Sequence, residues 1–255
     1  MNDWSDRTAL VTGGSRGIGA AVAVELARLG THVALLARDV AALEDVAGEC
    51  REVAPDGTPD PIVVAADITD AHTVEGEVAD VLAAFDGRLD LLANVAGASL
   101  RPVRVEDATD ADWDETLALN LVAPARLQRL CFPALREARG AVVNVGSIAA
   151  QRSAPLGATY AAAKAGLASL SRSAAIEWAR HGIRVNTIEP GFVDTEFNDQ
   201  MRAAGLEDRL LAKVPTRTPI SASEVARLVL VAADPDLPSF SGTVLSIDGA
   251  WSARL

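Results

Sequence analysis

The stretch "TGGSRGIG", residues 12–19, decides the fold class of this chain. The apolar run "TALVTG" (8–13) leads into it, and an alanine-rich segment follows it. Gly13, Gly17 and Gly19 let the backbone turn tightly and approach a pyrophosphate, to which a helix N-terminus offers N–H groups and partial positive charge. A strand, a glycine-rich turn and a helix in this order predict a dinucleotide-binding unit. The alternative is a tight turn without a ligand, since the spacing TGxxxGxG differs from the common GxGxxG.

Six further apolar runs repeat this pattern along the chain. Several are apolar at nearly every residue, as parallel strands buried on both faces are. Alanine- and leucine-rich segments separate them, which predicts an α/β fold with a doubly wound parallel sheet and helices on both faces. We expect one domain over residues 1–255, with a loop-plus-short-helix insertion beside the site at about 192–220. The six runs are 32–37, 61–66, 89–94, 141–146, 183–188 and 243–248.

Serine and proline mark features of the expected helices. Ser221 or Ser223 is the N-cap candidate for the last helix. The longest helical stretch, about 110–138, contains Pro124 and Pro133. Either proline could kink or break that helix.

Composition bounds the function. The formal net charge of −12 argues against nucleic acid and anionic membranes as partners, and mildly against an acidic carrier protein. Cys50 and Cys131 lie outside any CxxC pair, which favours buried free thiols in a reducing compartment over a disulfide or metal framework. The segment "MNDWSDR" lacks the pattern of a signal peptide, and no apolar run approaches the ~18 residues of a spanning helix. We expect a soluble, cytoplasmic protein without a metal.

Two arginines bear on the choice of cofactor. An acidic side chain at the end of the second strand would accept hydrogen bonds from the adenosine ribose of NAD. This chain has Ala37 and Arg38 there, and Arg16 within the glycine-rich turn. Guanidinium groups bind a phosphate in a planar fork, so the two favour NADP(H), with its 2′-phosphate, over NAD(H). The alternative is that both are surface arginines; Asp39, one residue later, is expected to cap the next helix.

The ends of the third and fourth strands offer further cofactor contacts. Asp67, in "AADITD", could hydrogen-bond the adenine amino group or cap the following helix. Asn94, Ala96 and Gly97, in "NVAG", end the fourth strand. Small residues there would let a cofactor ring lie close.

The chemistry starts from "TYAAAKAGL" (159–167), which holds the only tyrosine of the chain. Tyr160 and Lys164 stand four residues apart and therefore share one face of a helix. An ammonium beside a phenol favours the phenolate, so we expect Lys164 to lower the pKa of Tyr160 from its ordinary value near ~10. Such a tyrosine could exchange a proton with an alcohol or carbonyl oxygen while a nicotinamide carries the hydride. Taken alone, the pair could equally lie on a surface helix.

Two polar residues complete the predicted site. Ser147 follows the fifth strand, thirteen residues before Tyr160, where its hydroxyl could hold the substrate oxygen or simply form a turn or cap. Asn120 lies amid leucines in "LALNLVAP", and asparagine is costly to bury in a helix without partners. We expect a water-mediated link from Asn120 to Lys164. A satisfied structural amide is the alternative.

With these residues in place, the whole chain resembles the short-chain dehydrogenase/reductase family. The TGxxxGxG turn, NxAG, the helix asparagine, the serine and YxxxK follow the family's order and spacing, and "IEPGFVDT" (188–195) resembles its Pro-Gly turn. The resemblance implies a seven-stranded Rossmann sheet, an Asn-Ser-Tyr-Lys tetrad with Tyr160 as general acid/base, and a homotetramer or homodimer. Val95 and Ala250 depart from the frequent second asparagine and second glycine, and neither change removes a tetrad group.

The residue arguments and the resemblance together imply two sets of site residues. The catalytic set is Asn120, Ser147, Tyr160 and Lys164. Thr195 would contact the carboxamide side of the nicotinamide. The cofactor-binding set is Gly13, Ser15, Arg16, Gly17, Ile18, Gly19, Arg38, Asp67, Ile68, Asn94, Ala96, Gly97, Tyr160, Lys164, Pro190, Gly191, Val193 and Thr195.

The residues expected around the substrate follow Gly97, Ser147 and Gly191. They suit a moderately apolar ketone or secondary alcohol. Arg101 or Arg152 either meets a carboxylate or phosphate, or lies solvated at the rim. The apolar wall would be Leu100, Ala149, Pro155, Leu156, Phe192 and Met201, with Ser99, Gln151 and Arg152 as polar options.

Several functions stay open at this point. The nearest subgroup is the 3-oxoacyl-carrier reductase type, although Ile176 and Pro133 stand where such reductases often present arginine. A reductase of small ketones, or an NAD-dependent sugar or alcohol dehydrogenase, fits as well. A non-catalytic cofactor-binding regulator would need no proton donor. A serine hydrolase would need a GxSxG elbow or a histidine placed as a base for Ser147, and the sequence has neither.

Overall fold

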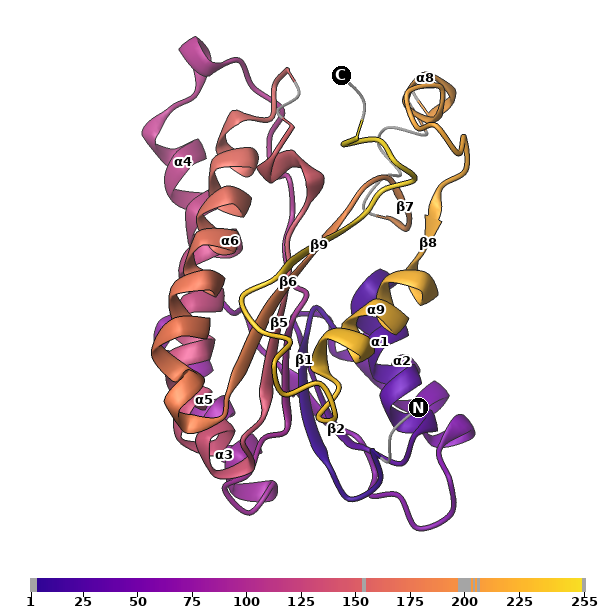
Figure 1. Ribbon diagram of the computed structural model, residues 1–255, viewed down its shortest axis with the longest axis vertical. Coiled ribbons are helices and arrows are strands. Elements are labelled where there is room, and N and C mark those ends of the chain that lie inside the picture. Colours follow the sequence, from indigo (N-terminus) through magenta and orange to yellow (C-terminus); the bar gives the residue numbers. More distant parts are fainter. Residues whose placement is uncertain (1–3, 153–154, 197–202, 204, 206, 254–255) are drawn as a thin grey trace.

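The structure, a computed structural model that describes residues 4–152, 155–196, 203, 205 and 207–253, is built on one parallel sheet (Figure 1). The strand order is β3-β2-β1-β4-β5-β6-β9, and all neighbouring pairs in it are parallel. The seven apolar runs of the sequence form these seven strands, so the predicted doubly wound sheet is confirmed. The strands are β1 (Thr8–Thr12), β2 (His32–Ala37), β3 (Ile62–Ala65), β4 (Leu91–Asn94), β5 (Ala141–Val145), β6 (Arg184–Pro190) and β9 (Val244–Ile247).

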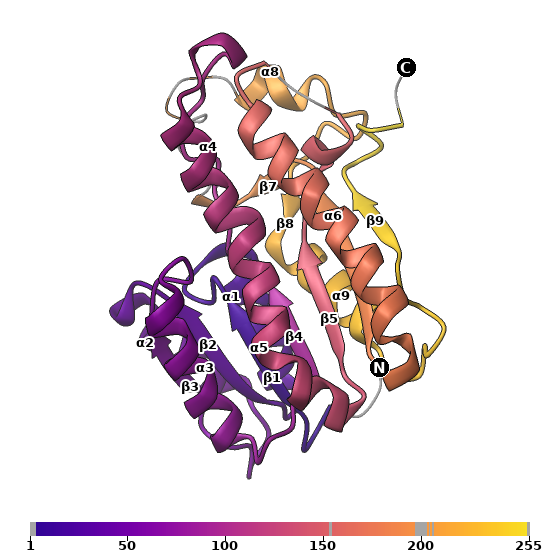
Figure 2. The same cartoon turned by 90° about the vertical axis from the view of Figure 1, so that its left-hand side faces the viewer.

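Helices cover both faces of this sheet (Figure 1). On one face lie α1 (Gly17–Arg28), α2 (Val40–Val53) and α9 (Ala222–Ala233). On the other lie α3 (Ala71–Ala84), α5 (Ala123–Ala138) and α6 (Ala158–Trp178). Figure 2 shows α4 (Asp110–Leu117) and α5 end to end over that second face, with α6 beside them. Short helical turns are η1 (Val105–Asp107), η2 (Ala118–Val122), η3 (Ile148–Ala150) and η4 (Ala179–His181).

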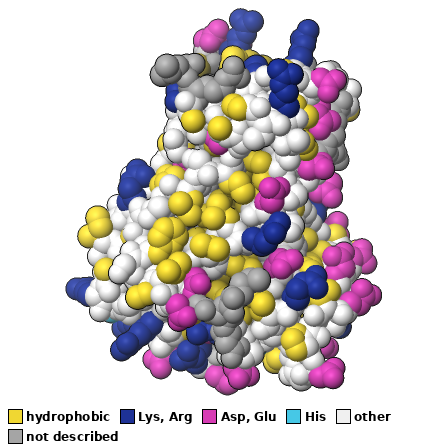
Figure 3. All heavy atoms as spheres, turned by 45° about the vertical axis from the view of Figure 1, so that its right-hand side comes forward, with side chains coloured by type: hydrophobic (Ala, Val, Ile, Leu, Met, Phe, Trp, Pro, Cys, Tyr) yellow, Lys and Arg dark blue, Asp and Glu magenta, His cyan; other side chains and the backbone are white. Residues whose placement is uncertain are grey.

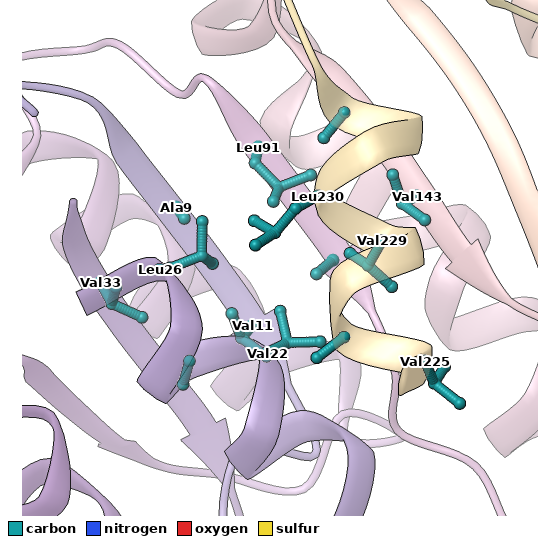
Figure 4. Close-up of a cluster of buried hydrophobic side chains, with 14 of the residues drawn as sticks. Ala9, Val11, Val22, Leu26, Val33, Leu91, Val143, Val225, Val229 and Leu230 are labelled. Carbon is teal, nitrogen blue, oxygen red and sulfur yellow. The ribbon is translucent and has the colours of Figure 1, made fainter. Parts of the chain in front are cut away.

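Alternate side chains of each strand enter different cores. Ala9 and Val11 of β1 pack into the core beneath α1, α2 and α9, while Leu10 between them packs into the opposite core. Figure 4 shows the first core, where Leu26 of α1 and Leu230 of α9 lie over the sheet. Burying each such side chain contributes roughly 1.5–3 kcal/mol. Because both faces are apolar, the strands read as continuous apolar runs.

The helix ends and the prolines behave only partly as expected. Ser221 caps α9, because its hydroxyl accepts a hydrogen bond from the N–H of Glu224. Pro124 is the second residue of α5, directly after η2, and Pro133 lies inside α5 without ending it. The predicted stretch of about 110–138 is interrupted instead at η2, a π-helical turn between α4 and α5.

The expected insertion at about 192–220 contains a second, two-stranded sheet. Its strands are β7 (Val193–Asp194) and β8 (Ile220–Ser221), which pair in parallel. The short helix α8 (Glu207–Leu211) lies between them in sequence. Sequence reasoning expected the short helix but not the strands. Met201, expected in the substrate wall, lies outside the described residues.

The surface and the thiols agree with the composition. On the face in Figure 3, acidic and basic side chains are interspersed around hydrophobic ones near its centre. Cys50 and Cys131 are buried and free, as expected, and burial raises the pKa of each thiol to about 12. Such thiols are unreactive near neutral pH. Within the described ranges, no helix combines the length and the apolar character needed to cross a membrane.

Candidate active site

The glycine-rich turn after β1 lies against two other parts of the predicted cofactor site. A Cβ atom on Gly13 would lie 3.0 Å from Cα and N of Ala96, and one on Gly19 would lie 2.1 Å from the carbonyl oxygen of Gly13. A Cβ atom on Gly17 would lie 3.2 Å from Cγ2 of Thr195. The turn, the "NVAG" segment and the Pro-Gly segment therefore meet at the carboxyl edge of the sheet, where α/β folds bind dinucleotides.

The N-terminus of α1 has no side-chain cap. Arg16 occupies the N-cap position and makes no capping hydrogen bond, and the first turn carries no acidic residue. Several other helices do have such caps, formed by Asp39 for α2, Asp70 for α3, Thr109 for α4 and Ser221 for α9. Because Arg16 does not cap the first N–H groups of α1, this helix end suits a pyrophosphate.

The predicted adenosine side contains Arg16, Arg38 and Asp67. Both arginines are exposed, and within the described residues neither forms an ion pair. The N–H and hydroxyl of Thr69 donate to Oδ1 of Asp67 at 2.9 and 2.7 Å. These hydrogen bonds, and less strongly the Arg38 charge, hold the pKa of Asp67 below its usual value. Asp70 caps α3, so the cap interpretation of Asp67 is wrong.

Arg126 of α5 holds the loop that follows β3. Its Nη1 donates to the carbonyl oxygens of Ile68 at 3.1 Å and Thr69 at 3.3 Å. Ile68, a predicted cofactor residue, is buried beneath this contact. Sequence reasoning missed Arg126 because an arginine on an amphipathic helix is more typical of a solvated face.

Ser147, Tyr160 and Lys164 come together where β5 ends and α6 begins. Ser147 and Tyr160 share a side-chain hydrogen bond, and the Ser147 hydroxyl also accepts from the N–H of Ala149 at 3.1 Å. Nζ of Lys164 donates to the carbonyl oxygen of Val145 at 2.8 Å and lies 5.7 Å from the centroid of the Tyr160 ring. A hydroxyl pair beside a buried ammonium is an arrangement suited to proton transfer.

The pKa values of this pair correct one expectation. Burial raises the pKa of Tyr160 to about 12, against a smaller lowering by the Ser147 hydrogen bond. Burial also lowers the pKa of Lys164 to about 8. We expected Lys164 to lower the pKa of Tyr160; desolvation of the phenol outweighs any such effect. The Tyr160 hydroxyl therefore stays protonated near neutral pH.

Replacing Lys164 by Met is expected to change how stability depends on pH. Lys164 titrates near 8 in the folded protein and near 10.5 otherwise. Between these values the unfolded chain binds more protons, so wild-type stability rises with pH across that window, by about 3 kcal/mol at most. Lys164→Met should lack this rise. Urea unfolding at about pH 7 and about pH 10 measures it, and equal pH slopes for the two proteins would contradict the prediction.

Asn120 lies in η2, and its amide is held by the backbone. Nδ2 donates to the carbonyl oxygens of Ala98 at 2.9 Å and Thr116 at 3.0 Å, and Oδ1 accepts from the N–H of Ala98 at 3.2 Å. This agrees with the structural-amide alternative. Asn120 nonetheless approaches Lys164, because a Cβ atom on Gly97 would lie 2.8 Å from Oδ1 of Asn120 and 3.0 Å from Nζ of Lys164. A water link between the two stays a prediction.

Other predicted cofactor residues lie at strand ends. Asn94 is buried and donates to Oδ1 of Asn144 at 2.8 Å, so its side chain belongs to the sheet interior. Pro190 ends β6, and a Cβ atom on Gly191 would lie 2.9 Å from Cα of Asp248. Val193 lies buried in β7, and Ser15 and Ile18 are partly exposed in the first turn and helix.

The two arginines on the predicted substrate side both have protein partners. Nη1 of Arg101 donates to both carboxylate oxygens of Asp112 at 3.1 and 3.0 Å. Nη2 of Arg152 donates to the carbonyl oxygen of Ser252 at 2.7 Å. Arg101 is therefore paired with a carboxylate, while Arg152 donates to a neutral carbonyl and keeps its charge unpaired among the described residues.

The expected apolar wall is divided between different places. Ala149, Pro155 and Leu156 line a hollow of about 430 Å³ beside α6, which neither Ser147 nor Tyr160 lines. Phe192 is buried, while Leu100 and Ser99 are exposed. Among the described residues, the members of the expected wall therefore differ in burial, and a common pocket stays a prediction.

Comparison with known proteins adds independent support. The profile of the short chain dehydrogenases matches residues 7–205. D-beta-hydroxybutyrate dehydrogenase of Rhizobium meliloti (strain 1021) is 31% identical over 260 residues, which cover 97% of this chain and 99% of that protein. 3-oxoacyl-(acyl-carrier-protein) reductase FabG of Staphylococcus aureus (strain Mu50 / ATCC 700699) is 30% identical over 244 residues, covering 95% and 97%. The crystal structure of levodione reductase superposes with a TM-score of 0.92 at 32% identity, covering 98% and 99%.

The sheet, the uncapped glycine-rich turn and the Ser-Tyr-Lys arrangement define a Rossmann-type oxidoreductase. The chain belongs to the short chain dehydrogenase family. Members of this family use nicotinamide cofactors.

Proposed function

We propose that this protein is an NADP(H)-dependent oxidoreductase that transfers a hydride between the nicotinamide and a carbonyl or secondary alcohol. The observation that carries the proposal is the Ser147–Tyr160 hydrogen bond beside the buried Lys164, at the sheet edge where the glycine-rich turn lies. The printed names of the relatives support the reaction class, since they include both a dehydrogenase and reductases.

In this proposal the chain's own residues handle the proton. A bound nicotinamide supplies or accepts the hydride. The Ser147 hydroxyl holds the substrate oxygen, and Tyr160, whose pKa burial raises to about 12, gives its proton to that oxygen during reduction. Lys164 holds the nicotinamide ribose and stands beside the phenol that must be reprotonated. Asn120, next to Lys164, would lead the returning proton from water.

The preference for NADP(H) can be tested at Arg38. We expect wild type to bind NADPH more tightly than NADH, because neither Arg16 nor Arg38 forms an ion pair within the described residues. Losing a charge-assisted contact of about 1.5–3 kcal/mol should make Arg38→Asp bind NADPH about 10- to 100-fold more weakly and leave NADH binding intact. Fluorescence titration with both cofactors measures this.

Arg180→Asp is the matched control for that charge change. Arg180 is exposed in η4, which leads into the amino end of β6, at the sheet edge opposite the predicted cofactor site. The Arg180→Asp variant should bind NADPH and NADH with the affinities of the wild-type protein. Tighter binding of NADH than of NADPH by the wild-type protein would overturn the arginine argument and favour the NAD-dependent alternative.

The substrate class follows from the rim. Because the Arg101 guanidinium pairs with the Asp112 carboxylate, we favour a neutral, moderately apolar ketone or secondary alcohol over an anionic one. A carrier-bound substrate is disfavoured by the net charge of −12. A panel of neutral ketones with NADPH tests the assignment, and absence of turnover with all of them would favour the regulator alternative.

Three further expectations belong to this proposal. One domain spans residues 1–255, and the protein is cytoplasmic. It assembles as a homotetramer or homodimer, which the exposed apolar side chains Val122 and Ile176 on the α4–α6 layer support.

A further inference from the structure

Glu189 is a buried carboxylate that the proposed mechanism does not use. It stands next to the last residue of β6, on the strand face toward α6, and only 1% of it is exposed. An ionised carboxylate is costly to bury, and β6 would fold as well with an apolar residue there. We therefore asked which contacts of Glu189 would explain a buried carboxylate at this position.

Glu189 contacts the chain on both sides of Ser147. Its Oε2 accepts a hydrogen bond from Nε2 of Gln151, four residues after Ser147. A Cβ atom added to Gly146, the residue directly before Ser147, would lie 3.0 Å from Cγ of Glu189, so this side chain packs closely against Gly146. Gly146 in turn donates its N–H to the carbonyl oxygen of Ile188 at 2.7 Å. The loop that carries the Ser147 hydroxyl is thus held at its two ends by one short piece of β6.

The backbone between these two contacts is a single tight turn. The N–H of Ala150 donates to the carbonyl oxygen of Ser147 at 2.9 Å, and the N–H of Gln151 donates to that of Ile148 at 3.0 Å. The hydrogen bond that fixes the position of Gln151 therefore also restrains Ser147, because η3 connects the two residues rigidly. The Gln151 side chain is otherwise exposed, so without Glu189 nothing described would orient it.

We propose that Glu189 is a positioning residue that acts through Gln151 to hold the Ser147 hydroxyl in hydrogen-bonding position with Tyr160. The inference rests on the proposed function, because the position of Ser147 matters only if Ser147 and Tyr160 act on a substrate. Displacement of a reacting group by about 1 Å can cost about 100-fold in rate. Glu189 touches neither substrate nor cofactor in this role.

Four variants test the proposal. Glu189→Leu and Gln151→Leu should each lower kcat about 10- to 100-fold with NADPH affinity unchanged. Their double variant should be no slower than either single one, because both break the same contact. Glu189→Gln keeps an oxygen that accepts from Gln151 and should retain most of kcat. Wild-type kcat in Glu189→Leu, or losses in the two single variants that multiply in the double one, would overturn the proposal.

Thr187→Val is the matched control for general loosening of β6. Thr187 lies two residues earlier on the same strand face, and its hydroxyl donates to Ser171 at 2.8 Å, away from Gln151. The kcat of Thr187→Val should stay near that of wild type even if the melting temperature of the variant falls. If Thr187→Val loses as much kcat as Glu189→Leu does, the effect of Glu189→Leu reflects general loosening of β6, and the proposal is overturned.

Hydrogen exchange separates this inference from the proposed function. Amides of residues 147–152 should exchange faster in Glu189→Leu than in Glu189→Gln, whether or not a substrate is known. If wild type turns over no ketone but this difference appears, the proposed function fails and the hold on the loop stands. If wild type is active and exchange is equal in the two variants, the positioning role fails.

Discussion

Tyr160→Phe is expected to lower kcat for ketone reduction by about 100- to 10,000-fold, the range that general acid catalysis contributes. The substitution removes only the hydroxyl and keeps the ring beside Lys164. Burial raises the pKa of that hydroxyl to about 12, so it carries the proton that the proposed mechanism gives to the substrate oxygen. Steady-state kinetics with NADPH and a ketone substrate measures the loss.

The same variant should bind NADPH with wild-type affinity and keep the wild-type melting temperature. These two measurements separate a lost proton donor from a lost cofactor site or a damaged fold. Full activity in Tyr160→Phe would refute the proposed mechanism, and a parallel loss of NADPH binding would mean that the phenol serves the cofactor more than the substrate.

Gly19→Ala is expected to destabilise the protein by about 1–3 kcal/mol, as overpacking does, and to remove measurable NADPH binding. The new Cβ atom would lie 2.1 Å from the carbonyl oxygen of Gly13, and that atom is backbone, which cannot rotate away. The turn must therefore open, and the first N–H groups of α1 would lose their alignment for a pyrophosphate. Urea unfolding and NADPH titration measure the two effects.

Gly76→Ala is the matched control for this change. Gly76 lies inside α3, and a Cβ atom there would meet nothing within 4 Å. Because alanine favours a helix over glycine, this variant should gain about 0.5–1 kcal/mol and bind NADPH normally. If Gly19→Ala binds NADPH with wild-type affinity, the turn tolerates a side chain, and the prediction that it binds the pyrophosphate is contradicted.

Local patterns predicted the elements and most of the site. Gly13, Ser147 and Asn94 were located because apolar strands end at recognisable places, and Tyr160 and Lys164 because residues four apart share a helix face. The strands of the small β7–β8 sheet were missed because two-residue strands carry no periodic signal. Glu189 left a trace in the sequence, an acid inside the otherwise uncharged run "VNTIEP", but its partner could not be read from it.

The role of each polar group was harder to predict than its position. Asn120 turned out to hold the backbone of Ala98, and Arg152 to reach Ser252, one hundred residues further along the chain. Neither pairing follows from spacing, because it depends on which loops the fold brings to the same edge of the sheet.

The sequence alone determined the alternation of strands and helices, the dinucleotide turn and the tyrosine–lysine pair, since backbone geometry sets these features within a few residues. Only the tertiary structure decided the protonation of that pair and the partners of Arg101, Arg126 and Glu189. The physical reason is desolvation. A pKa and the cost of a buried charge depend on every segment packed around a group, and those segments are distant in sequence.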